Sequence, residues 1–225
     1  MPKNPYYSGP PSDHFNGERF FLPGGRPTDK SRADLLKWRF RSRNLPAWPK
    51  HYPGPPQDRP PPRVQGAGLR VTFIGHASFL VQTQGLNFLV DPVWSERASP
   101  LSFAGPKRVN APGIAFDDLP PLDAILLTHN HYDHMDMATL KRLAHQRPCP
   151  IITPLGNDTI LRKAIAKVDA RAHDWGDRVH VGDAAVHLVP AQHWSARSLS
   201  DRRMALWCGF VIETHAGKIY ICGDT

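Results

Sequence analysis

Three imidazoles and one carboxylate fall within six residues of the segment Thr128-His-Asn-His-Tyr-Asp-His134. His129, His131 and Asp133 are spaced two apart, so in extended backbone their side chains point the same way and can converge. Imidazole and carboxylate together bind Zn²⁺ and also iron or manganese. Surface or capping histidines are the alternative, but such groups beside a buried strand carry a desolvation cost that a metal would offset. The cluster therefore predicts a metal site that includes His134.

The elements around this cluster predict a layered α/β domain. Residues 123–128 form a continuous apolar run, typical of a strand buried on both faces, and they lead directly into the cluster. Upstream, β-rich runs separated by small residues suggest an antiparallel meander at 70–75, 79–83 and 86–91. Downstream we expect helices at 137–146 and 157–168, and strands at 150–153, 185–189, 206–213 and 218–222. Strands that alternate with helices after a meander are typical of stacked layers.

The pattern His129-x-His131-x-Asp133-His134 resembles the signature of the metallo-β-lactamase superfamily. In that family two sheets pack face to face in an αββα sandwich, with two metal ions at one edge. The family pattern continues with a histidine after a later strand and an aspartate in a Gly-Asp-Thr turn, which His193 and Asp224 match here. Taken alone, the first would be an ordinary histidine and the second a turn residue.

The resemblance also assigns roles to these residues. It implies that His129, His131 and His193 hold one zinc ion and that Asp133 and His134 hold a second, with Asp224 bridging the two. Iron or manganese could replace zinc at such ligands. Asp133 and His134 are the predicted catalytic residues, and Asp133 can be interpreted either as a ligand or as the group that orients the attacking hydroxide.

A narrower resemblance covers most of residues 70–225. Several short motifs are similar to those of N-acylphosphatidylethanolamine-hydrolysing phospholipase D and its bacterial relatives: Gly75-His76-Ala77, Asp91-Pro92, Gly105-Pro-Lys-Arg108, Pro154-Leu-Gly156 and Gln192-His-Trp194. This resemblance implies a phosphodiesterase in which a metal-bridged hydroxide attacks a phospholipid and releases phosphatidic acid and an N-acylethanolamine. The same site could serve another substrate, such as nucleic acid, a lactone or a thioester.

The family's last metal ligand is a histidine well downstream of the Gly-Asp-Thr turn, whereas this chain ends at Thr225. We therefore expect only the N-terminal half of the sandwich, a second metal held by Asp133, His134 and Asp224 alone, and exposed sheet edges. A truncated relative that binds metal without turnover is a further interpretation.

Several other residues near the motifs can each be interpreted in two ways. His76 is either a hydrogen-bond partner of a metal ligand or an ordinary turn histidine, and Asp91 is either an acceptor for a ligand histidine or a turn cap. Lys107 and Arg108 could contact phosphate or lie in solvent. Trp194 could line a lipid pocket or belong to the core. Three arginines in a polar insert could meet an anionic head group: Arg197, Arg202 and Arg203.

Composition divides the chain into a basic, proline-rich extension at 1–65 and a metallo-β-lactamase-type domain at 66–225. Residues 1–65 contain 14 of the 24 prolines, and residues 1–70 contain 13 of the 28 basic but only 5 of the 20 acidic residues. Such an extension suggests an anionic partner, or it is a loosely packed, solvated segment. A helix at about 31–42 would place Ala33, Leu36 and Phe40 on one face. This stripe is short, which favours packing on the domain over lying on a membrane.

Composition also excludes several classes of protein. The sequence has no apolar run of the roughly 18 residues that span a bilayer and no apolar signal segment at its start. Cys149, Cys208 and Cys222 are an odd number without a C-x-x-C motif, which predicts reduced, mostly buried thiols in a cytoplasmic protein. Residues 71–225 carry no net charge, which argues against a nucleic-acid partner and leaves phospholipid or another phosphodiester. Peripheral contact with the inner membrane face would then involve the basic extension.

Overall fold

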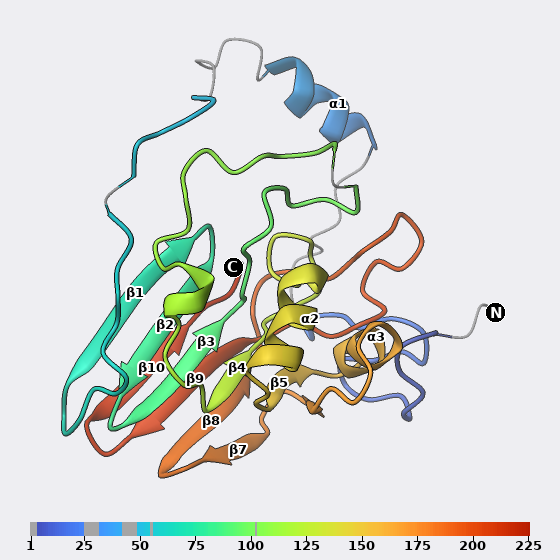
Figure 1. Cartoon of the computed structure of the whole chain (residues 1–225). Coiled ribbons are helices and arrows are strands. Elements are labelled where there is room, and N and C mark those ends of the chain that lie inside the picture. The colour runs from blue at the N-terminus through green and yellow to red at the C-terminus, as the bar shows by residue number, and fades with distance from the viewer. Residues whose placement is uncertain (1–3, 25–31, 42–48, 55, 102) are drawn as a thin grey trace.

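The computed structural model describes residues 4–24, 32–41, 49–54, 56–101 and 103–225. Within these ranges two β-sheets lie face to face, and two helices cover the outer face of the larger sheet (Figure 1). This layering matches the αββα class that the sequence predicts, with sheets and few helices. No helix among the described residues is long and apolar enough to cross a bilayer.

The larger sheet has six strands in the order β1-β2-β3-β4-β5-β6. The first three strands form the expected antiparallel meander, and the last three add in parallel. The strands are β1 (Leu69–Gly75), β2 (Ser78–Thr83), β3 (Leu86–Val90), β4 (Ala124–Leu126), β5 (Ile151–Pro154) and β6 (Ala170–His173). All three residues of β4 are buried, as the apolar run at 123–128 predicts. Strand β6 is not among the strands predicted from the sequence.

The smaller sheet has four antiparallel strands in the order β10-β9-β8-β7. Its strands are β7 (Arg178–Val181), β8 (Ala184–Val189), β9 (Gly209–Thr214) and β10 (Gly217–Ile221). Strand β7 was also not anticipated, because its sequence alternates Arg and His with valine and is half exposed at the edge of the sheet.

Three helices and one short 3-10 turn complete the described elements: α1 (Arg32–Arg41), η2 (Phe116–Asp118), α2 (Met137–Gln146) and α3 (Asn157–Ala164). Helix α2 has the predicted bounds, and Asp136 caps it by accepting from the backbone N–H groups of Ala138 and Thr139. Helix α3 is shorter than the predicted 157–168, because Ile165 is already extended and Lys167 adopts a positive φ that turns the chain into β6.

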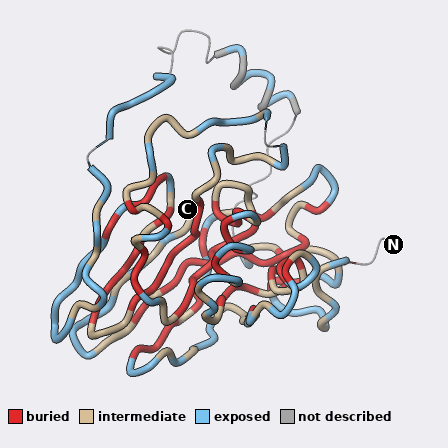
Figure 2. The backbone as a smooth tube through the Cα atoms, in the orientation of Figure 1, coloured by how far each residue is buried: buried red, intermediate tan, exposed pale blue. Residues whose placement is uncertain are grey.

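Alternation along the strands builds two cores on opposite faces of the larger sheet. Leu80, Leu89 and Ile125 face the helices, where they pack with buried leucines of α2 and α3. Their neighbours Val81 and Phe88 face the smaller sheet. Buried backbone runs through the strands of both sheets in Figure 2. Since a one-residue shift would exchange the two faces, the hydrophobic pattern sets the register that brings the strand ends into line.

Residues 4–24, here called the N-terminal segment, pack on the domain instead of lying in solvent. Phe15 and Phe20 are 1% and 0% exposed and contact Trp207 in a third apolar cluster. The Asn4 amide donates to the Met204 carbonyl over 2.8 Å, and the Tyr6 hydroxyl donates to Asp201 over 2.8 Å. The solvated interpretation of the extension is therefore wrong for this part of residues 1–65.

Helix α1 lies apart from the two sheets (Figure 1). Its Leu36 and Phe40 side chains are 56% and 58% exposed, and Ala33 is exposed as well. The expectation that this stripe packs on the domain is therefore wrong. A stripe of three side chains on a ten-residue helix buries too little apolar area to hold the helix against the domain. Edge strand β1 is likewise open on one face, where Leu69, Val71 and Phe73 are exposed as expected for an open sheet edge.

Candidate metal centre

The segments that follow β1, β4, β8 and β10 bring the predicted ligands to one edge of the sandwich. The loop after β4 carries His129, His131, Asp133 and His134, and the loops after β8 and β10 bring His193 and Asp224 beside it. All six predicted ligands lie in two adjacent groups. The structure adds His76, from the turn after β1, to the second group.

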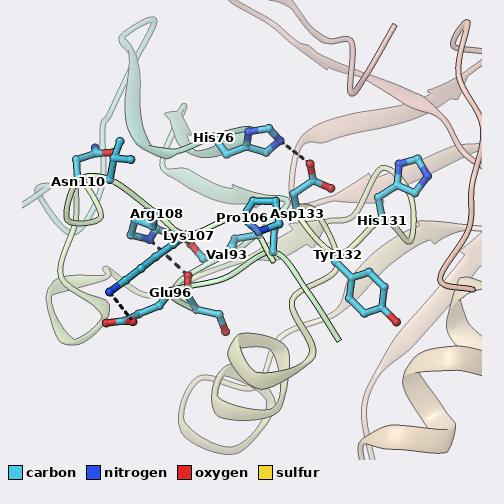
Figure 3. Close-up of a pocket in the computed structure, with 13 residues that line it drawn as sticks. His76, Val93, Glu96, Pro106, Lys107, Arg108, Asn110, His131, Tyr132 and Asp133 are labelled. Carbon is cyan, nitrogen blue, oxygen red and sulfur yellow. Dashed lines mark hydrogen bonds and ion pairs between the residues drawn. The ribbon is translucent and has the colours of Figure 1, made fainter. Parts of the chain in front are cut away.

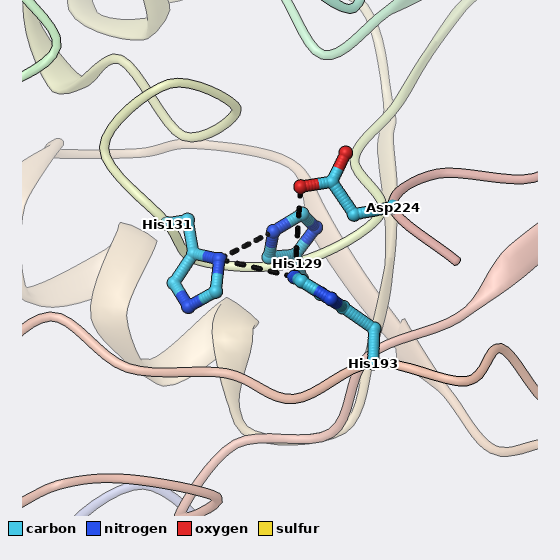
Figure 4. Close-up of side chains that lie close together, drawn as sticks. All are labelled: His129, His131, His193 and Asp224. Atoms are coloured by element: carbon cyan, nitrogen blue, oxygen red, sulfur yellow. Dashed lines mark hydrogen bonds and ion pairs between the residues drawn. The ribbon is translucent and has the colours of Figure 1, made fainter. Parts of the chain in front are cut away.

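The first group consists of His129, His131, His193 and Asp224, whose side chains turn toward one another in Figure 4. His131 Nδ1 lies 2.9 Å from His129 Nε2 and 3.2 Å from His193 Nε2. One carboxylate oxygen of Asp224, Oδ2, lies 3.6 Å from His193 Nε2. Three ring nitrogens and a carboxylate oxygen thus surround one point, which is the arrangement that a tetrahedral metal ion requires.

The second group consists of His76, Asp133 and His134. His76 Nε2 lies 3.0 Å from Asp133 Oδ2. His134 Nε2 lies 3.3 Å from Oδ1 of Asp224, the carboxylate whose other oxygen faces His193. Asp224 therefore stands between the two groups with one oxygen toward each, as the bridging role implied by the family resemblance requires.

Asp91 organises both groups from a buried position. Its carboxylate accepts three hydrogen bonds, from the Thr128 backbone N–H (2.7 Å), the Thr128 hydroxyl (2.6 Å) and His134 Nδ1 (2.7 Å). Because the Thr128 hydroxyl gives its only proton to Asp91, it accepts from His129 Nδ1, which lies 2.9 Å away. His129 and His134 therefore both carry a proton on Nδ1, which leaves Nε2 as the nitrogen that faces the cluster. Of the two interpretations for Asp91, the structure supports the acceptor for a ligand histidine.

Burial keeps the three imidazoles of the first group neutral. Burial, reinforced by the surrounding imidazoles, holds the pKa of His129 well below its usual value. Burial and the neighbouring His193 lower the pKa of His131 to about 4. Burial also lowers the pKa of His193, against the opposing charge of Asp224. Neutral imidazoles are the form that binds a metal, so this group is ready for an ion at neutral pH.

The second group is charged instead. Burial lowers the pKa of His134, but the carboxylates of Asp91 and Asp224 outweigh it and raise the pKa to about 10. Burial raises the pKa of Asp133, yet the hydrogen bond from His76 and the charge of His134 bring it down to about 2. Among the described residues, the buried Nε2 atom of His134 has no well-aligned hydrogen-bond partner. A metal ion at this nitrogen would replace its proton and satisfy the orphaned atom.

Metal binding is therefore expected to release protons unequally at the two groups. At pH 7 the first group is already neutral, so its metal displaces no proton, whereas the second must displace at least the proton on His134. The affinity of the second metal should rise about tenfold per pH unit between pH 7 and 9, while the first stays constant. Calorimetric zinc titrations in buffers with different heats of ionisation measure both effects. Equal proton release in the two binding steps would contradict this assignment.

Arg197 supports the loop after β4, which carries four of the predicted ligands. Its guanidinium Nη1 donates to the carbonyls of Asn130 (3.0 Å) and Met135 (2.9 Å), which stand on either side of the ligands His131 to His134. Its own carbonyl accepts from the Tyr132 hydroxyl over 2.9 Å. This arginine thus supports the loop that carries the predicted ligands, and its contact with a head group stays a prediction. No local pattern reveals this role, because the partners lie more than sixty residues apart.

Trp194 and Arg202 lie beside the cluster of predicted ligands. The Trp194 ring meets the His131 ring edge-on, with centroids 4.5 Å apart. The guanidinium carbon of Arg202 lies 4.1 Å above the Trp194 ring, within the range of a cation–π contact. Trp194 therefore belongs to the site rather than to either apolar core between the layers.

A cleft of about 500 Å³ opens beside the two groups (Figure 3). His76, His131 and Asp133 line one end of it, and the cationic side chains Lys107 and Arg108 line the other. Lys107 pairs with Glu96 over 3.4 Å, and Arg108 Nη2 donates to the Val93 carbonyl over 2.8 Å. The cleft thus joins ligand atoms to two fixed positive charges.

Comparisons with known proteins agree with this architecture. A family model described as "Beta-lactamase superfamily domain" matches residues 86–225. The chain is 37% identical over 168 residues to N-acyl-phosphatidylethanolamine-hydrolyzing phospholipase D 1 of Caenorhabditis elegans, covering 71% of this chain and 47% of that protein. It is 31% identical over 160 residues to a UPF0173 metal-dependent hydrolase of Pyrobaculum neutrophilum, covering 70% of this chain and 62% of that protein.

Solved structures resemble the chain as well. The diiron beta-hydroxylase CmlA from Streptomyces venezuelae superposes with a TM-score of 0.53 at 25% identity, covering 70% of this chain and 30% of that protein. The chain spans about half the length of the curated relatives it matches, 53% and 47% in two of them. The family model covers more than half of this chain, and the structure has the face-to-face sheets that the family resemblance implies. The chain therefore belongs to the β-lactamase superfamily and has the metallo-β-lactamase fold.

Proposed function

We propose that this chain belongs to a metal-dependent phosphodiesterase of the phospholipase D type, which acts on N-acyl phosphatidylethanolamine-like phospholipids. One observation carries the proposal: two groups of ligand atoms share the carboxylate of Asp224, beside a cleft that also holds Lys107 and Arg108. The 37% identity to the nematode protein named as a phospholipase D supports the substrate class.

In this proposal each group holds one metal ion. His129, His131 and His193 supply three nitrogens to the first ion, and Asp133 and His134 bind the second. Asp224 reaches both with its two oxygens. Nitrogen and carboxylate ligands suit zinc best and iron or manganese next. Iron stays among the candidates because CmlA, which shares the fold, is named as a diiron enzyme.

Two metal ions bound at these residues would supply a water molecule of lowered pKa and neutralise charge on a phosphoryl oxygen. The residues of the chain bind and orient the substrate. The Lys107 ammonium faces the cleft beside Glu96, so a phosphate that enters competes with Glu96 for this charge. The hydrogen bond from Arg108 to Val93 stiffens the same wall. Water adds to phosphorus, the bond from phosphorus to the head-group alcohol breaks, and the alcohol leaves with a proton.

The test combines metal content with a panel of substrates. The purified chain is loaded with zinc, iron or manganese and assayed on N-acyl phosphatidylethanolamine in mixed micelles, a simple phosphodiester, a lactone and a thioester. We expect two metal ions per chain and release of N-acylethanolamine in preference to the other products. A chain that binds two metals but hydrolyses only the lactone or thioester would rule out the phosphodiesterase assignment.

Lys107→Ala gives the matched test of substrate charge. It is expected to raise KM for the anionic phospholipid about tenfold, the effect of losing one charge-assisted contact of about 1.4 kcal/mol, and to leave metal content unchanged. Lys141→Ala is the control, because this lysine is exposed on α2, outside the cleft. An equal change in both variants would show that general surface charge, rather than the cleft, attracts the substrate.

A further inference from the structure

We propose that His76 is a further protein ligand of the second metal ion, beside Asp133, His134 and the shared carboxylate of Asp224. This inference rests on the proposed two-metal function, and the experiment below separates the failure of one from the failure of the other. It goes beyond the ligand set implied by the family resemblance, in which His76 has no role.

The backbone fixes the position of His76. Strand β1 ends at Gly75, and His76 adopts a positive φ of 52°, so the chain reverses at once into β2. The Ser78 hydroxyl donates to the Asp91 carbonyl, which ties this turn to the residue whose carboxylate orients His134. On the other side, the Arg108 guanidinium packs against Gly75, where an added Cβ would lie 2.6 Å from Arg108 Nη1. The turn is therefore held in place from both sides.

The separations within the group fit a common metal ion. Ligands about 2.0–2.1 Å from a tetrahedral ion are about 3.3 Å from each other. His76 Nε2 lies 3.0 Å from Asp133 Oδ2, and His134 Nε2 lies 3.3 Å from Asp224 Oδ1. The ligand atoms of His76, Asp133 and His134 all lie within 4.8 Å of one another. Small side-chain rotations would bring the three atoms onto one ion.

The surroundings of His76 allow such a rotation. Its side chain is 56% exposed on the cleft side, whereas that of His134 is fully buried. The His76 and His134 rings are inclined at 76°, with centroids 5.5 Å apart, so they are not stacked face to face.

The test counts metal ions and records the cobalt spectrum of the whole chain. We expect two Co²⁺ ions in the wild type. In His76→Ala we expect the first ion to bind unchanged and the affinity for the second to fall by roughly a hundredfold, with loss of part of the visible absorption. His145→Ala is the matched control, an exposed histidine on α2. Circular dichroism checks that each variant is folded.

His76→Cys separates a ligand from a positioning residue. A thiolate at this position is expected to restore the second ion and to add a sulfur-to-cobalt charge-transfer band, which a residue that only orients Asp133 cannot produce. Two ions with an unchanged spectrum and affinity in His76→Ala, or no such band in His76→Cys, would overturn the inference and leave the two-metal proposal standing. Fewer than two ions in the wild type would instead overturn the two-metal proposal itself.

Discussion

His131→Ala is expected to abolish turnover, with a loss of at least about a thousandfold, or about 4 kcal/mol of transition-state stabilisation. His131 Nδ1 is the atom that lies within 3.2 Å of both other nitrogens of the first group. Its removal leaves two imidazoles that no longer surround an ion. The first metal should therefore be lost, and with it the charge that the reaction requires.

Without metal, the same variant should lose only the uncharged contacts that the His131 ring makes with His129, His193 and Trp194. Burial already lowers the pKa of His131 to about 4, so this imidazole adds no charge–charge attraction at neutral pH that folding would lose. Zinc should raise the melting temperature of the wild type, because it binds only the folded state, and it should raise that of the variant by less, because only the second group can still bind an ion. Thermal unfolding with and without zinc measures this difference. An equal zinc-induced shift in both proteins would show that His131 is not a ligand.

Asp91→Asn is expected to weaken both metal sites at once and to destabilise the fold by about 3 kcal/mol. An amide has one oxygen to accept hydrogen bonds, whereas the Asp91 carboxylate accepts three with two oxygens. At least one of the three donors, the Thr128 N–H, the Thr128 hydroxyl or His134 Nδ1, must then lose its acceptor or face the NH₂ group of the new asparagine. The proton positions of His129 and His134 would no longer be fixed, so metal affinity should fall about 10–100-fold at each site.

Chemical unfolding of the metal-free chain and metal titration by chelator competition measure the two effects separately. Asp117→Asn is the control, since this carboxylate is 83% exposed and its ion pair within the described ranges is with Arg142, away from both metal groups. Normal affinity at either site in Asp91→Asn would show that the hydrogen bonds of Asp91 support the fold but do not orient the ligand histidines.

The metal cluster could be predicted because its chemistry is local. His129, His131, Asp133 and His134 lie within one loop, and the family resemblance extended the pattern to His193 after a later strand. Most strand positions also followed from apolar runs and alternation. Strand β7 was missed because an edge strand needs few buried side chains and can therefore carry arginine and histidine at alternate positions.

The supports of the cluster could not be predicted in the same way, because each depends on contacts between distant parts of the chain. Arg197 donates hydrogen bonds to the backbone carbonyl groups of residues 130 and 135. Every residue has such a carbonyl group, so the side chains at these positions do not predict the contact. Residues 4–24 were predicted to belong to an extension because the surrounding sequence, residues 1–65, is rich in proline and basic residues. Their aromatic pair, Phe15 and Phe20, finds its apolar partner Trp207 only in the folded molecule.

The docking of residues 4–24 on the far end of the chain also sets an order of events during synthesis. Tyr6 and its partner Asp201 are separated by 195 positions, which a ribosome adding about 5–20 residues per second covers in about 10–40 s. Throughout that interval Phe15 and Phe20 can contact each other and Tyr7 but not Trp207. Residues 4–24 thus leave the ribosome before the domain and reach their contacts with it only after residue 207 has been made, so chaperones have long access to this segment.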